Sequence, residues 1–163
     1  MKTLLLLRHA KSSHKQPRLW DHDRPLAKRG EQAAPVMGQL LVDEELVPEL
    51  IISSTAARAR QTAELVAESC GYEGEVRYNR SLYMADPEQY VAVAEKTKPQ
   101  IDRLMLIGHN PGMTYLKAML TGDDEHMPTA SLAVITFDID DWRALSIHSA
   151  GKLEALWLPR ELD

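Results

Sequence analysis

Cysteine is almost absent from this 163-residue chain, which contains only Cys70. A single cysteine excludes an internal disulfide and a cysteine-rich metal cluster, and it is typical of proteins in a reducing compartment. Long apolar runs are absent too, since no stretch approaches the roughly 18 residues that span a bilayer. The first apolar run, residues 4–7, ends at Arg8 and is too short for the core of a signal peptide. We therefore expect a cytoplasmic protein with no membrane partner.

Basic residues are concentrated in one segment of an otherwise acidic chain. The net charge is −5, from 19 basic and 24 acidic residues. Residues 8–30 hold seven bases and two acids, a local charge of +5, so the rest of the chain carries −10. An acidic body argues against a nucleic-acid partner, because nucleic-acid-binding domains are generally basic. The basic segment fits a local site for a small anion, or else a solvated basic loop.

Strand-like and helix-like segments alternate along the chain. At about 100–200 residues per domain, the length predicts a single domain, 1–163. The expected helices run from the end of a polar loop at 9–27 to about residue 45, and over 57–70, 87–96 and 111–120; within the first, Pro35 either lies in the first turn or kinks the helix. The expected strands are 2–8, 50–53, 75–78, 104–107, 132–138, 144–148 and 153–158. This order predicts an α/β three-layer sandwich, with a mainly parallel sheet, an antiparallel portion and helices on both faces.

Arginine and histidine side chains follow three of the predicted strands. Arg8 and His9 come directly after the first strand, Arg58 lies in the helix after the second, and His109 follows the strand at 104–107. Ligands of open α/β sheets bind at the carboxyl ends of the strands. Taken singly, each residue has an ordinary explanation as an ion pair or a cap. Together they predict a site for a tetrahedral dianion, with a histidine nucleophile inside it.

Other candidate sites have less support. Cys70 as a phosphatase nucleophile would need an arginine six positions later, and none is there. His14, His22 and His126 lack the close spacing of metal ligands, and we interpret them as surface loop residues. Asp21 and Asp23 are candidate acid–base groups, but loop capping or pairing with Arg24 or Arg29 is the simpler interpretation. Tyr83, Trp142 and Trp157 are interpreted as packing residues.

The chain resembles the histidine phosphatase superfamily, whose fold is phosphoglycerate mutase-like. The resemblance is carried by LLLRHAKSS at the start, SSTAARARQTAE in the middle and LIGHNPG later. The segments DHDRPLAKRG, RSLYMADPEQ and MPTASLAVITFD are similar to its short SixA-type phosphohistidine phosphatase branch. The resemblance covers residues 2 to about 158, nearly the whole chain.

This resemblance implies roles for five residues. His9 would be the nucleophile that becomes phosphohistidine, Arg8 and Arg58 would clamp the phosphate, His109 would donate to a phosphoryl oxygen, and Arg24 would contact the substrate. The chain departs from the superfamily pattern twice. Ala10 stands where glycine is usual, and Met84 stands where the mutases and broad phosphatases have a proton-donating glutamate.

The resemblance implies a metal-independent, cofactor-free phosphatase. The expected substrate is phosphohistidine on a protein such as a phosphotransfer domain, hydrolysed through a covalent intermediate on His9. Phosphate, sulfate or a similar oxyanion would occupy the site, and we expect a monomer. Two alternatives stay open: a phosphomonoesterase for small sugar or nucleotide phosphates, and a phosphate-binding module without turnover. Mutase activity is not expected, because the short chain leaves little material for a lid.

Overall fold

A six-stranded mixed sheet forms the centre of the protein. The computed structural model describes residues 1–159. The strand order is β3-β2-β4-β1-β5-β6. Four strands are parallel, β1 (Lys2–Arg8), β2 (Leu50–Ser53), β3 (Arg77–Tyr78) and β4 (Arg103–Gly108), whereas β5 (Leu132–Phe137) and β6 (Lys152–Trp157) are antiparallel to their neighbours. The predicted mainly parallel sheet with an antiparallel portion is confirmed.

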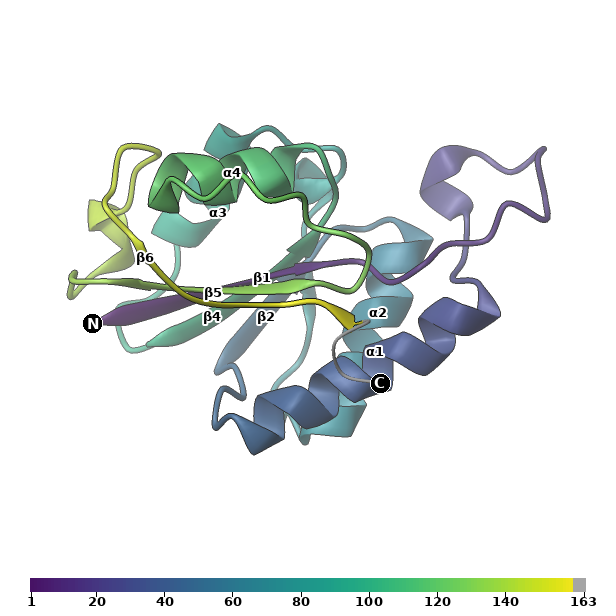
Figure 1. Cartoon of the computed structure of the whole chain (residues 1–163), viewed down its shortest axis with the longest axis horizontal. Coiled ribbons are helices and arrows are strands. Elements are labelled where there is room, and N and C mark those ends of the chain that lie inside the picture. Colours follow the sequence, from purple (N-terminus) through teal and green to yellow (C-terminus); the bar gives the residue numbers. More distant parts are fainter. Residues whose placement is uncertain (160–163) are drawn as a thin grey trace.

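Helices cover both faces of this sheet, as predicted (Figure 1). The helices α1 (Lys28–Asp43) and α2 (Ala57–Cys70) lie on one face, and α3 (Pro87–Glu95) and α4 (Gly112–Thr121) lie on the other. Residues of β1 alternate between the two layers: Leu4 and Leu6 pack toward α3 and α4, and Leu5 and Leu7 pack toward α1 and α2. An uninterrupted apolar strand is required here because both of its faces are buried.

Local sequence signals explain where the helices begin and end. Pro87 opens α3 behind a capping box formed by Asp86 and Gln89, and Gly71 ends α2 in the left-handed conformation, with φ of 71°. Pro35 lies in the middle of α1, where its carbonyl accepts a hydrogen bond from the Ser69 hydroxyl of α2. No helix within residues 1–159 is both long and apolar enough to cross a membrane.

The expected strand at 144–148 is wrong. A 3₁₀ turn at Trp142–Ala144 replaces its start, and a turn follows. The Trp142 side chain is fully buried, and its indole N–H donates to the carbonyl of Ile101 at 2.7 Å. Leu145 is buried beside it. The apolar residues of this segment therefore close one end of the core instead of extending the sheet.

Candidate active site

The carboxyl ends of β1, β2 and β4 meet at one edge of the sheet, and the predicted site residues lie there. Arg8 ends β1 and His9 follows it, Arg58 is in the first turn of α2, and His109 follows β4. These four side chains line a common cavity of about 390 Å³. His9, Arg58 and His109 are buried, and the His9 and His109 rings lie 5.1 Å apart between centroids. The structure thus brings together all four residues that the sequence singled out.

The His9 imidazole is held in one orientation by its own backbone. Its Nδ1 lies 2.7 Å from the carbonyl oxygen of Ala10, so Nδ1 carries the hydrogen and donates it. The other ring nitrogen, Nε2, then has a free electron pair. Burial lowers the pKa of His9 to about 4, helped by the charges of Arg58, Arg8 and Arg24 and opposed by the bond to Ala10. His9 is therefore neutral at physiological pH, as a nucleophile must be.

Ala10 fits the position where the superfamily has glycine. Its φ is not positive, so its Cβ introduces no backbone strain. The Ala10 amide donates to the Thr62 hydroxyl at 3.0 Å, and that hydroxyl donates to the Arg58 carbonyl at 2.7 Å. Thr62 thus links the segment that carries His9 to the first turn of α2.

The backbone of His109 is fixed by Tyr90 of α3. The Tyr90 hydroxyl accepts from the His109 amide at 3.0 Å and donates to its carbonyl at 3.3 Å. The same hydroxyl lies directly against Gly108, where a Cβ atom would collide with it. Glycine is therefore required before His109 by this close approach.

The ring of His109 is set by Ser54. Its Nε2 lies 2.7 Å from the Ser54 hydroxyl oxygen, which also accepts from the Ala56 amide at 3.2 Å. If the serine hydroxyl donates to Nε2, the His109 ring carries its hydrogen on Nδ1. Burial lowers the pKa of His109 to about 3, with smaller contributions from His9 and the arginines. The result is a neutral ring that presents an N–H donor.

Three buried nitrogens at the cavity have no hydrogen-bond partner within residues 1–159. They are Nε of Arg8, Nε of Arg58 and Nδ1 of His109. Arg8 otherwise donates to the Met127 carbonyl at 3.0 Å. Buried donors are normally satisfied, because leaving one unpaired costs about 1–3 kcal/mol. Two arginines and a histidine with unpaired buried nitrogens line the cavity together with the neutral His9, which makes it suited to an oxyanion.

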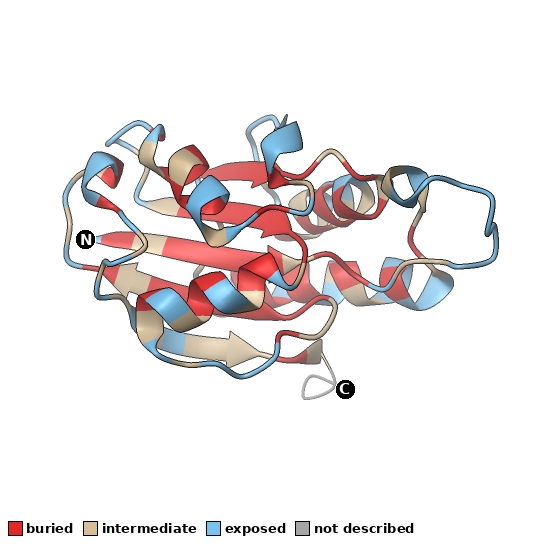
Figure 2. Cartoon of the chain, turned by 90° about the horizontal axis from the view of Figure 1, so that it is seen from above, coloured by how far each residue is buried: buried red, intermediate tan, exposed pale blue. Residues whose placement is uncertain are grey.

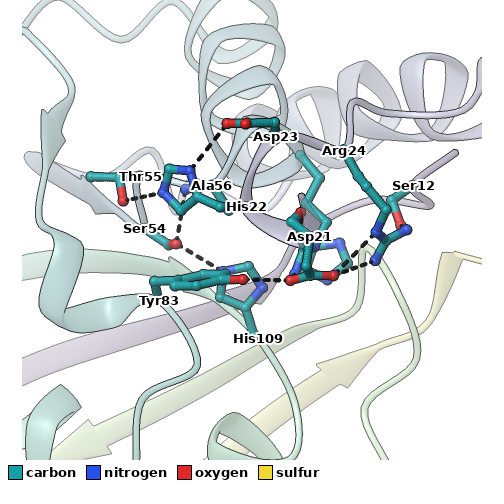
Figure 3. Close-up of polar contacts among 12 residues, drawn as sticks. Ser12, Asp21, His22, Asp23, Arg24, Ser54, Thr55, Ala56, Tyr83 and His109 are labelled. Atoms are coloured by element: carbon teal, nitrogen blue, oxygen red, sulfur yellow. Dashed lines mark hydrogen bonds and ion pairs between the residues drawn. The ribbon is translucent and has the colours of Figure 1, made fainter. Parts of the chain in front are cut away.

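An acidic side chain also enters the cavity. The Asp21 carboxylate accepts from Arg24 at 3.1 Å and from the Tyr83 hydroxyl at 2.6 Å (Figure 3). It also accepts from Arg58 at 2.9 Å. Burial alone would raise the pKa of Asp21, but the bonds from Tyr83, Arg58 and Arg24 hold it well below its usual range. Asp21 is therefore ionised. Arg24 also donates to the Ser12 hydroxyl at 2.8 Å, which places it at the rim.

Two residues of this site make contacts that the sequence did not predict. Tyr83 was expected to pack, yet its hydroxyl binds Asp21 and its ring meets the His109 ring edge-on, 5.5 Å between centroids. Ser53, Ser54 and Thr55 are all candidates from the sequence to cap this helix, but the residue before α2 is Ala56, which makes no side-chain cap, and Ser54 contacts His109 instead. Tyr83 precedes Met84, whose side chain lines the cavity. Its position next to Met84 was the one sequence signal that could have placed Tyr83 at the site.

The remaining candidates from the sequence do not belong to the group formed by Arg8, His9, Arg58 and His109. Cys70 is buried between α2 and α1, and burial raises its pKa. His22 contacts the Thr55 hydroxyl and His126 is exposed. His14 is an exposed loop residue, as expected, but it lines the same cavity as His9, and its Nδ1 lies 3.3 Å from a guanidinium nitrogen of Arg24. Within residues 1–159, no three histidine, cysteine, aspartate or glutamate side chains gather where they could hold a metal ion.

Arg58 and Arg60 offer a matched pair of substitutions on one helix. Arg58→Ala is expected to lower kcat about 100- to 1000-fold, because it removes a buried charge from the cavity. Arg60 points about 200° away around the helix and stacks on the Tyr78 ring, 4.7 Å from its centroid. Arg60→Ala should therefore leave kcat near wild type. Equal kinetics for the two variants would remove Arg58 from the reacting site.

Known proteins are similar to this chain in sequence and in fold. Residues 4–83 match the family described as histidine phosphatase superfamily (branch 1). An uncharacterized chloroplastic protein of Arabidopsis thaliana is 35% identical over 96% of this chain and 77% of its own length. An uncharacterized protein of Mycobacterium leprae is 31% identical over 94% of this chain and its own full length.

Solved structures are also similar to this chain. SixA from Agrobacterium tumefaciens superposes with a TM-score of 0.82 and 30% identity, covering 97% of this chain and 98% of its own. The protein histidine phosphatase SixA complexed with tungstate has a TM-score of 0.84 and 21% identity, covering 99% of both chains. With the fold, the sequence match and the paired arginines and histidines all in agreement, the chain belongs to the histidine phosphatase superfamily.

Proposed function

We propose that this protein is a metal-independent phosphatase that hydrolyses phosphohistidine on a protein through a covalent intermediate on His9. The observation that carries the proposal is the neutral His9, with Nε2 free, in a cavity lined by Arg8, Arg58 and His109, each of which has an unpaired buried nitrogen. Arg8 and Arg58 would bind phosphoryl oxygens, His109 would donate from Nδ1, and Arg24 would contact the substrate at the rim. The tungstate bound to SixA, a protein of the same fold, supports an oxyanion in this cavity.

The proposed reaction has two in-line displacements at phosphorus. In the first, Nε2 of His9 attacks, the P–N bond to the substrate imidazole breaks, and its electron pair stays on that imidazole with a proton on its other nitrogen. In the second, water attacks phosphorus, the bond to His9 breaks, and inorganic phosphate leaves. The arginines and His109 stabilise the charge on the equatorial oxygens in both steps.

A comparison of substrates tests this proposal. Phosphate release would be measured from a phosphotransfer domain phosphorylated on histidine, from an aryl phosphate and from sugar phosphates. We expect kcat/KM to be highest for the phosphohistidine protein, lower for the aryl phosphate and lowest for the sugar phosphates. Sugar phosphates turned over as efficiently as phosphohistidine would support the small-molecule phosphomonoesterase instead. Binding of phosphate without turnover of any substrate would support the non-catalytic module.

The pH dependence of kcat/KM should report the lowered pKa of His9. Above this pKa the imidazole is neutral and nucleophilic, and below it protonation removes the attacking electron pair. With an acid-stable aryl phosphate, and after correction for the substrate's own ionisation, kcat/KM should stay level below neutral pH and fall as pH drops through about 4. Circular dichroism over the same range would exclude unfolding. A fall centred near 6.5, the usual histidine value, would contradict the buried environment of His9.

A further inference from the structure

A strongly exposed loop rises from the rim of the cavity. Residues 14–20, which we call the Trp20 loop, are all exposed and project from the body of the protein (Figures 1 and 2). The Trp20 side chain is 82% exposed and the neighbouring Leu19 is 37% exposed. Tryptophan is highly buried on average in folded proteins, and it is enriched among the residues that carry binding energy at protein interfaces.

The base of the Trp20 loop is fixed to the active site. Ser12 and Asp21, which flank the loop, both line the cavity. Arg24 bonds to Ser12 and Asp21, and Asp21, next to Trp20, bonds to Arg58. Ser13 is also tied to Pro25 through its amide at 2.8 Å. The exposed tip therefore stands at a defined position beside the cavity.

The charge of the loop is of one sign. Residues 9–20 contain no acid, and they carry Lys11, Lys15 and Arg18, all exposed. An apolar tip surrounded by bases is complementary to an apolar patch bordered by acidic side chains. Arginine and tryptophan together are also typical of interface centres, whereas a small phosphate ester would not extend to the tip.

We propose that the Trp20 loop is the docking surface for the phosphohistidine-bearing substrate protein. This inference rests on the proposed function. Because His9 is buried, a phosphohistidine on a folded protein reaches it only if the surrounding protein surface settles on the rim. Trp20 and Leu19 would then pack on an apolar patch beside the phosphohistidine, and Lys15 and Arg18 would pair with acidic residues around that patch. The loop would select protein substrates while leaving the chemistry unchanged.

The experiment compares one large and one small substrate on the same variants. The large one is a phosphotransfer domain phosphorylated on histidine, and the small one is free phosphohistidine. Trp20→Ala should lower kcat/KM on the domain about 10- to 30-fold, mostly through KM, and leave free phosphohistidine unchanged. Lys15→Glu combined with Arg18→Glu should act in the same direction, with the loss shrinking as salt is added. Tyr115→Ala is the control, because Tyr115 on α4 is 57% exposed and does not line the cavity.

The outcomes separate this inference from the proposed function. Wild-type enzyme that fails on both phosphohistidine substrates overturns the proposed function, and this inference with it. Normal wild-type turnover with no effect of Trp20→Ala on the domain overturns this inference alone. Equal losses on both substrates would mean that Trp20 acts only by holding Asp21, and would also overturn it. Sedimentation of the wild type and of Trp20→Ala tests a self-interface, since a dimer lost in the variant would assign the loop to a second copy.

Discussion

Replacing His9 with alanine is expected to abolish turnover and the phosphoenzyme together. The substitution removes the buried, neutral ring nitrogen that has a free electron pair beside Arg8 and Arg58, whereas Nε2 of His109 contacts Ser54. Loss of a covalent nucleophile lowers kcat by roughly 10⁴-fold or more. Rapid quench with ³²P-labelled substrate should trap a protein-bound phosphate in the wild type that is labile in acid and stable in base. The His9→Ala variant should show none.

His126→Ala provides the matched control for this loss. His126 is exposed and lies outside the cavity, so the labelled phosphate and the turnover should both persist. Phosphate bound to the His9→Ala variant should still be measurable, because Arg8, Arg58 and His109 stay in place. A His9→Ala enzyme with near-normal turnover would contradict the assignment of the nucleophile, and so would label that maps to another residue.

The layered fold could be predicted because its signals are local and repeated. Apolar strands of the β1 type, buried on both faces, require helices on either side, and Gly71 and Pro87 mark helix ends through their own backbone chemistry. The segment 144–148 was wrongly predicted to be a strand because its alternating apolar residues match a strand pattern. Burial of Trp142 and its bond to Ile101, 41 positions away, decide the conformation there. The local pattern of apolar and polar residues does not reveal such a long-range contact.

The residues of the site likewise include some that could be predicted from the sequence and some that could not. Arg8, His9, Arg58 and His109 could be brought together from the sequence because each follows a strand, and the ends of parallel strands share one edge. Asp21, Tyr83 and Ser54 could not, because their contacts depend on how the loops fold back over that edge. Asp21 reaches Arg58 across 37 positions, and Ser54 reaches His109 across 55. No spacing rule relates residues so far apart.

The second large effect, on the hydrolysis of phosphate esters, is expected because position 84 lacks a proton donor. An alkyl or sugar phosphate expels an alkoxide, which a general acid must protonate as the bond breaks, whereas an imidazole leaves readily once its other nitrogen is protonated. Met84 lines the cavity and is 53% exposed, and its thioether supplies no proton. Asp21, Asp23 and Asp86 are the candidate substitute acids. Asp21 lines the cavity, but Tyr83, Arg58 and Arg24 hold it ionised, so it carries no proton to give.

Met84→Glu is therefore expected to raise kcat/KM on sugar phosphates, toward the 10²- to 10⁴-fold that a positioned general acid contributes. Turnover of phosphohistidine should change little, because its leaving group does not need the acid. Met84→Gln is the matched control: it has the same length and polarity but no acidic proton, and it should bring no gain. If glutamine and glutamate raise ester hydrolysis equally, polarity rather than proton donation limits the wild type. If Asp21→Asn instead removes an existing ester activity, Asp21 rather than position 84 supplies the proton, and the argument from Met84 fails.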